Sequence, residues 1–265
     1  FNAKVKSETT KKDNKTAKVE YYVSTGEPYI VDSLSTHIDS PVIDSLYNNS
    51  KGKSFVTLNE QYKTTNFEQE KDRLTYYFRN HGIYHFSEDY VYFEMDTIET
   101  QNTVKVDLQI QNRLIKTEDS STREPFKVYK IKDVNIFTDY SYRKRNKSIN
   151  DSISFEGYNL YSNDEIRFKP KALTDAVFIT PGSVFKDHDR TMSYRHITEL
   201  RTFKYPNIEY LENPDTTLTA NVYLTPLKKF GLSFSAEVSQ SNIQQIGLSF
   251  NPSVLMCYFC VIILM

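Results

Sequence analysis

Two histidines four residues apart are the first candidates for chemistry in this sequence. His81 and His85 have the spacing of two metal ligands on one helix face, but Gly82 lies between them. Because glycine commonly ends a helix, the two imidazoles are not expected to share a face. We therefore expect no metal site at these histidines.

A second group, Asp187, His188 and Asp189, resembles a hydrolase fragment only in composition. Helix capping and the helix dipole explain acidic residues at the start of a helix. His196 and Glu199 are three residues apart on the same expected helix and are read as surface groups. No nucleophile, base and orienting group come together in the sequence, so we expect no enzyme, no cofactor and no metal.

A cysteine pair, Cys257 and Cys260, lies in the apolar run at the end of the chain. The C-x-x-C spacing occurs in redox and zinc sites, but no second ligand pair accompanies it here. The chain has 7 glycines and neither of the glycine-rich phosphate-loop patterns. Nucleotide chemistry is therefore not expected.

The composition favours a sheet-rich α+β protein. The 265 residues include 20 Tyr and 17 Phe, and aromatic residues at alternating positions favour strands. The formal net charge of −1 lacks the basic excess that nucleic-acid binding normally needs, so we expect no nucleic-acid partner.

Two stretches of the chain predict the same order of elements, β-α-α-β-β. In residues 27–113, a strand precedes a short helix with Ser40 as its cap and a second helix with Asn66 as its cap. Two strands follow, at 84–95 and 103–111. In residues 126–227, a strand, two helices opened by Pro170 and Asp187, and two strands repeat this order.

Between these elements lies a polar stretch, residues 139–151, which is expected to be a solvated loop. It carries four basic residues, which favour either a phosphate-binding role or a solvated charge run. They are Arg143, Lys144, Arg145 and Lys147.

Residues 1–25 predict a β-hairpin, expected to complete a domain that precedes this chain, so the N-terminus is not expected to be the native one. At the other end, within residues 230–253, apolar and polar residues alternate at 232–239 and again from Ile246 to Phe250, as in two transmembrane barrel strands. The apolar tail, 254–265, is too short for a spanning helix. It is expected to be either an anchor or a non-native end caused by truncation or a frameshift.

Three stretches resemble the POTRA domains of BamA/TamA-type outer-membrane assembly factors, in particular the TamL-like proteins of Bacteroidetes. They are "TGEPYIVDSLSTHI" (25–38), "DRLTYYFRNHGIYHFSEDYVYF" (72–93) and "LTANVYLTPLKKFGLSFSAEVSQSN" (218–242). The resemblance covers most of the chain and implies tandem POTRA modules at 27–113 and 126–227. It also implies a preceding POTRA hairpin at 1–25 and the first strands of a truncated barrel at 230–253.

The resemblance implies a periplasmic arm, at the periplasmic face of the outer membrane, that binds client proteins by β-augmentation. The clients are unfolded outer-membrane proteins, or periplasmic or inner-membrane partner proteins. The expected binding strands are the sheet edges at 88–94 and 207–212. Their candidate residues are Tyr90, Val91, Tyr92, Phe93, Ile208, Glu209, Tyr210 and Leu211.

Three alternatives stay open. The tyrosines of the expected edges could simply pack on the helices, because an edge strand has a buried face as well as a free backbone. The whole chain could instead be a secreted or surface adhesion module without a barrel, which a concave aromatic pocket would indicate. A periplasmic scaffold that orients partners without holding clients is the third reading.

Overall fold

The computed structural model describes residues 3–12, 16–97, 102–117, 120–142, 147–227, 230–241 and 245–256. The chain forms two compact units. Unit 1 comprises Phe1–Phe78 and His85–Phe126, and unit 2 comprises Arg79–Tyr84 and Lys127–Met265. Each unit is a mixture of helices and small sheets, as the composition predicts.

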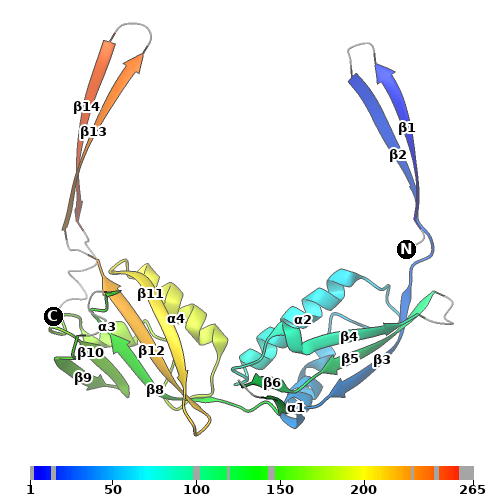
Figure 1. Cartoon of the computed structure of the whole chain (residues 1–265), viewed down its shortest axis with the longest axis horizontal. Helices are drawn as coiled ribbons and strands as arrows, with labels where there is room; N and C mark the ends of the chain where they lie inside the picture. Colours follow the sequence, from blue (N-terminus) through cyan, green and yellow to red (C-terminus); the bar gives the residue numbers. More distant parts are fainter. Residues whose placement is uncertain are drawn as a thin grey trace. The chain divides into compact units, whose positions relative to one another are not determined.

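Unit 1 holds the first eleven elements of the chain (Figure 1). They are β1 (Lys4–Lys12), β2 (Thr16–Ser24), β3 (Ile30–Ile38), α1 (Pro41–Ser50), the 3₁₀ turn η1 (Lys51–Lys53), α2 (Thr64–Arg79), η2 (Glu88–Tyr90), β4 (Val91–Asp96), β5 (Thr103–Ile110), β6 (Arg113–Lys116) and β7 (Ser121–Glu124). The last residue of α2, Arg79, is counted with unit 2.

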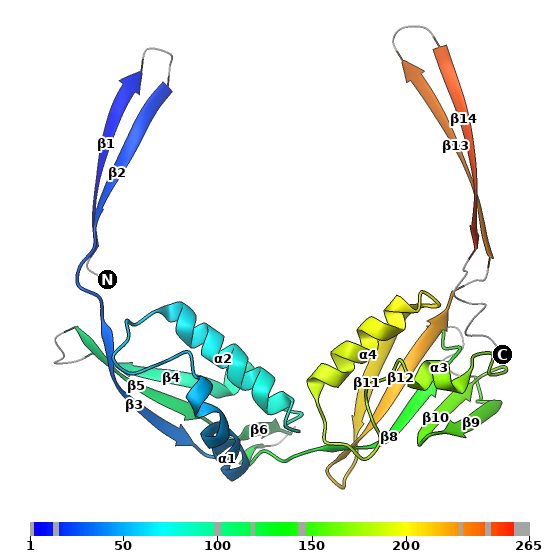
Figure 2. The same cartoon turned by 180° about the vertical axis from the view of Figure 1, so that it is seen from behind.

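The main sheet of unit 1 has the order β3-β5-β4, with β3 parallel and β4 antiparallel to β5. Helices α1 and α2 lie over one face of this sheet, which is visible from both sides of the molecule (Figures 1 and 2). Strand β5 alternates as predicted, and its four aliphatic residues are at most 4% exposed. These residues are Val104, Val106, Leu108 and Ile110.

Helix α2 begins at Thr64, so the prediction that Asn66 caps it is wrong. The backbone N–H of Asn66 already donates to the carbonyl of Lys63 in the opening turn. Glu70, on the side of α2 that faces the interior, is only 1% exposed. The predicted stop is confirmed, because Gly82 follows the helix with a φ of 93°.

Ser40 does occupy the cap position of α1, with an extended backbone, but its side chain makes no capping hydrogen bond. The Ser40 hydroxyl instead accepts a hydrogen bond from the backbone N–H of Phe126, at 3.1 Å. The fixed φ of Pro41 at the first helical position is enough to start the helix. Ser40 therefore links the start of α1 to the segment around Phe126, 86 residues further along the chain.

Unit 2 contains nine further elements. They are β8 (Lys130–Phe137), β9 (Asp151–Phe155), β10 (Tyr158–Ser162), α3 (Pro170–Thr174), α4 (Asp187–Glu199), β11 (Phe203–Glu212), β12 (Thr217–Pro226), β13 (Phe230–Ser241) and β14 (Gln245–Met256). The main sheet has the order β11-β12-β8-β10-β9. Strands β9 and β10 were not predicted; they form a hairpin whose turn has positive φ at Glu156 and Gly157.

The predicted repeat extends to the strand register. In unit 1, Val31 pairs with Val104 and Ser33 with Lys105, so a bulge skips Asp32. In unit 2, Ile131 pairs with Leu218 and Asp133 with Thr219, so the bulge skips the equivalent residue. Positions in β3 and β8 therefore correspond one to one, 100 residues apart.

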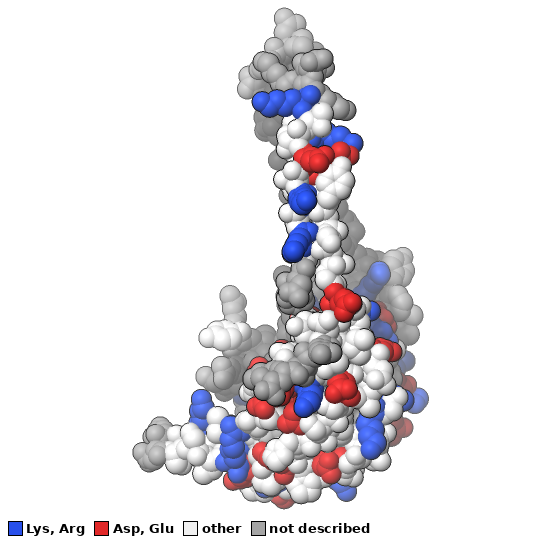
Figure 3. All heavy atoms as spheres, turned by 90° about the vertical axis from the view of Figure 1, so that its right-hand side faces the viewer, with Lys and Arg blue, Asp and Glu red and all other residues white. Residues whose placement is uncertain are grey.

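Three separate hairpins complete the chain: β1-β2, β6-β7 and β13-β14. Hairpins β1-β2 and β13-β14 lie where strands were expected, and that β13-β14 begins a barrel stays a prediction. Hairpin β6-β7 was not predicted. Along β1-β2 both charge signs are interspersed (Figure 3), and Lys18 pairs with Glu20 at 2.6 Å.

Strand β14 continues past the predicted boundary at residue 253, because Val254, Leu255 and Met256 pair with Phe230–Leu232. The rest of the predicted tail, residues 257–265, lies outside the described residues. Both cysteines lie outside the described residues.

Candidate strand-binding edges

Strand β4 is an edge of the unit 1 sheet, because among the described strands it pairs only with β5. The backbone N–H of Gln111 donates to the carbonyl of Tyr90, at 3.4 Å. Backbone groups in a strand point alternately to the two sides, so Tyr92 and Glu94 also face β5. The N–H and C=O groups of Val91, Phe93 and Met95 therefore point to the free side.

The four candidate residues of this first edge differ in secondary structure and in the exposure of their side chains. Tyr90 lies in the 3₁₀ turn η2 and β4 begins at Val91, so the predicted strand start at residue 84 and the predicted edge start at Glu88 are both too early. Its ring packs edge-on against Phe126, with ring centres 5.1 Å apart. Val91 is fully buried and Phe93 is half-buried, whereas Tyr92 is 47% exposed. Tyr92 is thus the candidate whose side chain a partner could contact on the outer face.

Strand β11 is the corresponding edge of unit 2 and pairs with β12. The N–H of Asn213 donates to the carbonyl of Thr217, which places Glu209 and Leu211 toward β12 by alternation. The backbone groups of Ile208 and Tyr210 therefore point to the free side. The other edge of this sheet is β9.

The candidate side chains of β11 divide in the same way. Ile208 is 3% exposed, and the ring of Tyr210 packs edge-on against Phe185, with ring centres 5.3 Å apart. Burial raises the pKa of Tyr210, and its hydroxyl is buried without a hydrogen-bond partner among the described groups. Glu209 is exposed and Leu211 is 54% exposed, on the outer face. For Ile208 and Tyr210, packing against the unit's own interior is thus the role that the structure shows.

Strand β3 forms the second edge of the unit 1 sheet, which the sequence did not single out as a site. Asp39 donates its backbone N–H to Ile110 on the β5 side, at 3.0 Å. By alternation the backbone groups of Leu34, Thr36 and Ile38 face away from β5. Beyond an isolated bridge between Ile30 and Gln61, no described strand pairs with this side.

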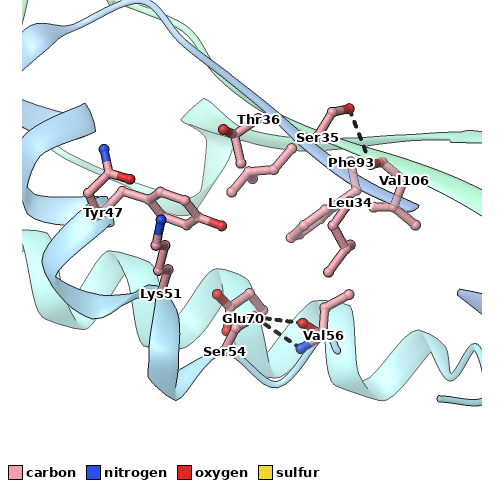
Figure 4. A pocket seen from close by; sticks show the side chains of 12 residues that line it. Leu34, Ser35, Thr36, Tyr47, Lys51, Ser54, Val56, Glu70, Phe93 and Val106 are labelled. Atoms are coloured by element: carbon pink, nitrogen blue, oxygen red, sulfur yellow. Dashed lines mark hydrogen bonds between the residues drawn. The ribbon is translucent and has the colours of Figure 1, made fainter. Parts of the chain in front are cut away.

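A cavity of about 330 Å³ opens beside β3, between the sheet and the end of α1 (Figure 4). Leu34 and Thr36 line it from β3, and Tyr47 and Lys51 line it from the helix side. Side chains from the sheet and from α2, including Phe93 and Glu70, complete the lining. The cavity thus combines apolar carbon with a few polar groups, as ligand sites commonly do.

The charge of Glu70 is neutralised within unit 1. Arg73 donates from Nε to Glu70 Oε2, at 2.8 Å, and from Nη2 to Oε1, at 2.7 Å. The backbone N–H of Phe55 also donates to Glu70 Oε2. Hydrogen bonding to Glu70 raises the pKa of Arg73, and burial raises the pKa of the nearby Tyr47 phenol. Of the two charged residues that line the cavity, Glu70 is neutralised by Arg73, and the positive charge of Lys51 is left over.

The histidine and acidic candidates for chemistry form no metal site among the described residues. His81 is exposed beyond the end of α2, and the described residues contain no group of His, Cys, Asp and Glu that could hold a metal ion. Asp187 pairs with Arg79, at 2.9 Å, and the side chain of Asn80 accepts the N–H of His188 at the start of α4. Burial raises the pKa of Asp189. The acidic residues thus belong to a helix start, as the dipole argument predicts.

No described helix is long and apolar enough to cross a membrane. No protein-family model matches the chain, and no curated protein sequence matches it.

Several solved structures are similar to this chain at low identity. The BamA POTRA3-5 fragment of Haemophilus influenzae shares 10% identity, with a TM-score of 0.44 over 84% of this chain and 72% of that one. BamA from Haemophilus ducreyi lacking POTRA domains 1-3 shares 9%, with a TM-score of 0.49 over 85% of this chain and 34% of that one. POTRA1-3 of Omp85 from Anabaena shares 11%, with a TM-score of 0.31 over 85% and 75%.

Proposed function

We propose that this chain is a periplasmic arm of an outer-membrane protein assembly factor, built from POTRA modules at 27–113 and 126–227. It binds unfolded outer-membrane proteins, or periplasmic or inner-membrane partner proteins, by adding their extended segments to its sheet edges. The hairpin that begins at Phe230 starts the barrel that receives the clients, and residues 1–25 close a preceding module. The resemblance to TamL-like proteins of Bacteroidetes supports this assignment.

The observation that carries the proposal is the pair of free sheet edges, β4 and β11, at the same place in the two repeats. Among the described strands, each of these two pairs on one side only, and each turns the backbone groups of its more buried residues to the other side. An edge of this kind offers hydrogen bonds that any extended segment can satisfy. Binding through the main chain suits clients of many sequences.

The test compares two substitutions at Met95, whose backbone points to the free side of β4 and whose side chain is 40% exposed. Met95→Pro removes the outward N–H, which an edge strand tolerates. Met95→Ala removes the side chain and keeps the N–H. The probe is a fluorescent peptide with the sequence of β13, FGLSFSAEVSQS, whose alternation is that of a barrel strand.

Loss of one main-chain hydrogen bond at the edge should weaken binding about fivefold to tenfold in Met95→Pro and little in Met95→Ala. Equal affinities of both variants and the parent chain for the peptide would count against augmentation at β4. Thermal unfolding of each variant checks that the unit 1 sheet is intact.

A secreted or surface binding module remains the alternative function. Its discriminating property is binding to a folded partner or a glycan rather than to extended peptides. Absence of binding by the β13 peptide to the parent chain would favour that alternative.

A further inference from the structure

We propose that the free edge of β3 in unit 1 is a second peptide-binding site, distinct from β4, which takes an extended segment parallel to β3. The segment has the pattern aromatic-x-aliphatic, and one of its apolar side chains enters the cavity between β3 and α1. This inference rests on the proposed function in assuming that the chain binds extended segments, and it adds a side-chain requirement.

Unit 2 shows what covers this edge when it is occupied. There, β10 pairs in parallel with β8, placing Asn159 beside Asn135 and Leu160 beside Ile136. Because the register of the two units matches, Ile136 of β8 corresponds to Thr36 of β3, and Val134 corresponds to Leu34. Strand β10 therefore lies where unit 1 has no described strand.

Equivalent side chains of β3 and β8 differ in solvent exposure, as expected if only β8 is covered by a neighbouring strand. Val134 and Ile136 are both 0% exposed, whereas Leu34 is 40% exposed and Thr36 is also exposed. All four side chains belong to the helix-facing side of their strands, which is otherwise buried. Unit 1 thus leaves uncovered an apolar position that its sister unit covers.

The side chains of β10 define the chemistry of the occupant. Tyr158 is 8% exposed and Leu160 is 0% exposed, and both join the main core of unit 2. Asn159 between them points to the other face, where its amide donates to Asn135. A segment that repeats this alternation would direct its apolar side chains toward the helices and into the cavity beside β3.

The charge of the cavity lining indicates that the bound segment should also carry a carboxylate. Arg73 neutralises the charge of Glu70, and the lining of the cavity therefore has a net positive charge from Lys51. A carboxylate near the apolar residues of the segment complements this lysine. The loop before β10 has such a residue, Glu156, two positions before Tyr158.

The experiment uses the whole chain and a fluorescent peptide with the sequence of residues 155–162, FEGYNLYS. Two matched variants distinguish the edges of unit 1. Leu34→Asp places a charge beside the cavity at β3, and Met95→Asp places one at β4, at a residue with the same 40% exposure. We expect the peptide to bind about tenfold more weakly to Leu34→Asp and with unchanged affinity to Met95→Asp.

Two additional measurements separate the side-chain effect from the backbone effect. A peptide with aspartate in place of the leucine, FEGYNDYS, should bind about tenfold more weakly to the parent chain. Thr36→Pro, which removes an outward N–H of β3, should weaken binding while Thr36→Ala should not. These variants keep the test valid if Leu34→Asp perturbs the fold.

A photo-crosslinking amino acid at the leucine position of the peptide locates the site. Adducts within residues 47–56 would support the proposal. Adducts on β4, or on β8 after displacement of β10, would overturn it, as would equal binding to Leu34→Asp and Met95→Asp. If the β13 peptide still depends on Met95 while FEGYNLYS does not bind, this inference fails and the proposed function stands; if neither peptide binds, both fail.

Discussion

At the scale of one residue, Gly82 occupies a position in unit 2 where both the backbone conformation and the close neighbours exclude a side chain. Its φ of 93° is one that side-chain-bearing residues rarely adopt, and a Cβ would lie 2.6 Å from Val128 Cγ1 and 2.8 Å from Val184 Cγ1. We expect Gly82→Ala to lower the free energy of unfolding by about 2 kcal/mol or more, from backbone strain and overpacking together. Urea denaturation followed by circular dichroism measures this loss.

Gly52 provides the matched control, because a Cβ there meets no atom within 4 Å and its φ is not positive. Gly52→Ala should leave stability unchanged or raise it slightly, since alanine restricts the unfolded chain. A loss as large as that of Gly82→Ala would mean that both glycines are sensitive for a reason other than local geometry.

The Glu70–Arg73 pair is the second prediction at this scale. Glu70 has a side chain 2% exposed and Arg73 one 14% exposed, with two charge-assisted hydrogen bonds between them. Arg73→Ala would leave a buried carboxylate without its cation, and we expect a loss of about 3 kcal/mol in the stability of unit 1.

The comparison for this pair is Arg195→Ala. Arg195 lies 3.9 Å from Glu199 in an exposed pair, so little change in stability is expected. Equal effects of the two substitutions would show that Arg73 does not neutralise Glu70 in solution.

At the scale of elements, the two units differ in whether the first strand is covered. Leu160 of β10 is fully buried beside β8, so Leu160→Ala should cost about 2–5 kcal/mol. Leu34→Ala removes the same side-chain atoms at the open edge and should cost less than about 1 kcal/mol. Equilibrium denaturation of both variants measures the contrast, and similar losses would mean that the β3 edge is covered in solution.

The elements that the sequence predicted are those with strict alternation or strong helix signals. Val104 to Ile110 and Leu218 to Leu224 alternate without interruption, which fixes both the strand and its buried face. Strands β9 and β10 were missed because they adjoin a polar loop. Their signal is short: Ile153 and Phe155, a Glu-Gly turn, then Tyr158 and Leu160.

The candidate site was only partly predictable, for a physical reason. Alternation identifies β4 and β11 as strands, but which strand is an edge depends on pairing between distant segments. The cavity beside β3 draws its lining from β3, α1, η1 and α2, which no single periodic pattern connects. The sequence holds one trace of it: Thr36 is polar at a helix-facing position where unit 2 has Ile136.

At the scale of the whole molecule, the two units share the β-α-α-β-β order and the register of their first strands, and each has a hydrophobic core of its own. The main core of unit 2 gathers β8, β10, α3, α4, β11 and β12 around residues such as Ile136 and Leu173. A core of unit 1 includes Val31, Phe67 and Val106. Domains with their own cores commonly unfold separately, and a single unfolding free energy then has no clear meaning.

This separation predicts two unfolding transitions for the chain, each sensitive to substitutions in one unit. Arg73→Ala should shift the transition of unit 1 and leave the other in place, because the pair that it breaks lies wholly within unit 1. Leu160→Ala should do the reverse, since every neighbour of Leu160 in the core belongs to unit 2. Calorimetry of the parent chain and both variants makes the comparison. A single transition that both substitutions shift equally would show that the repeats, despite their separate cores, unfold as one cooperative body.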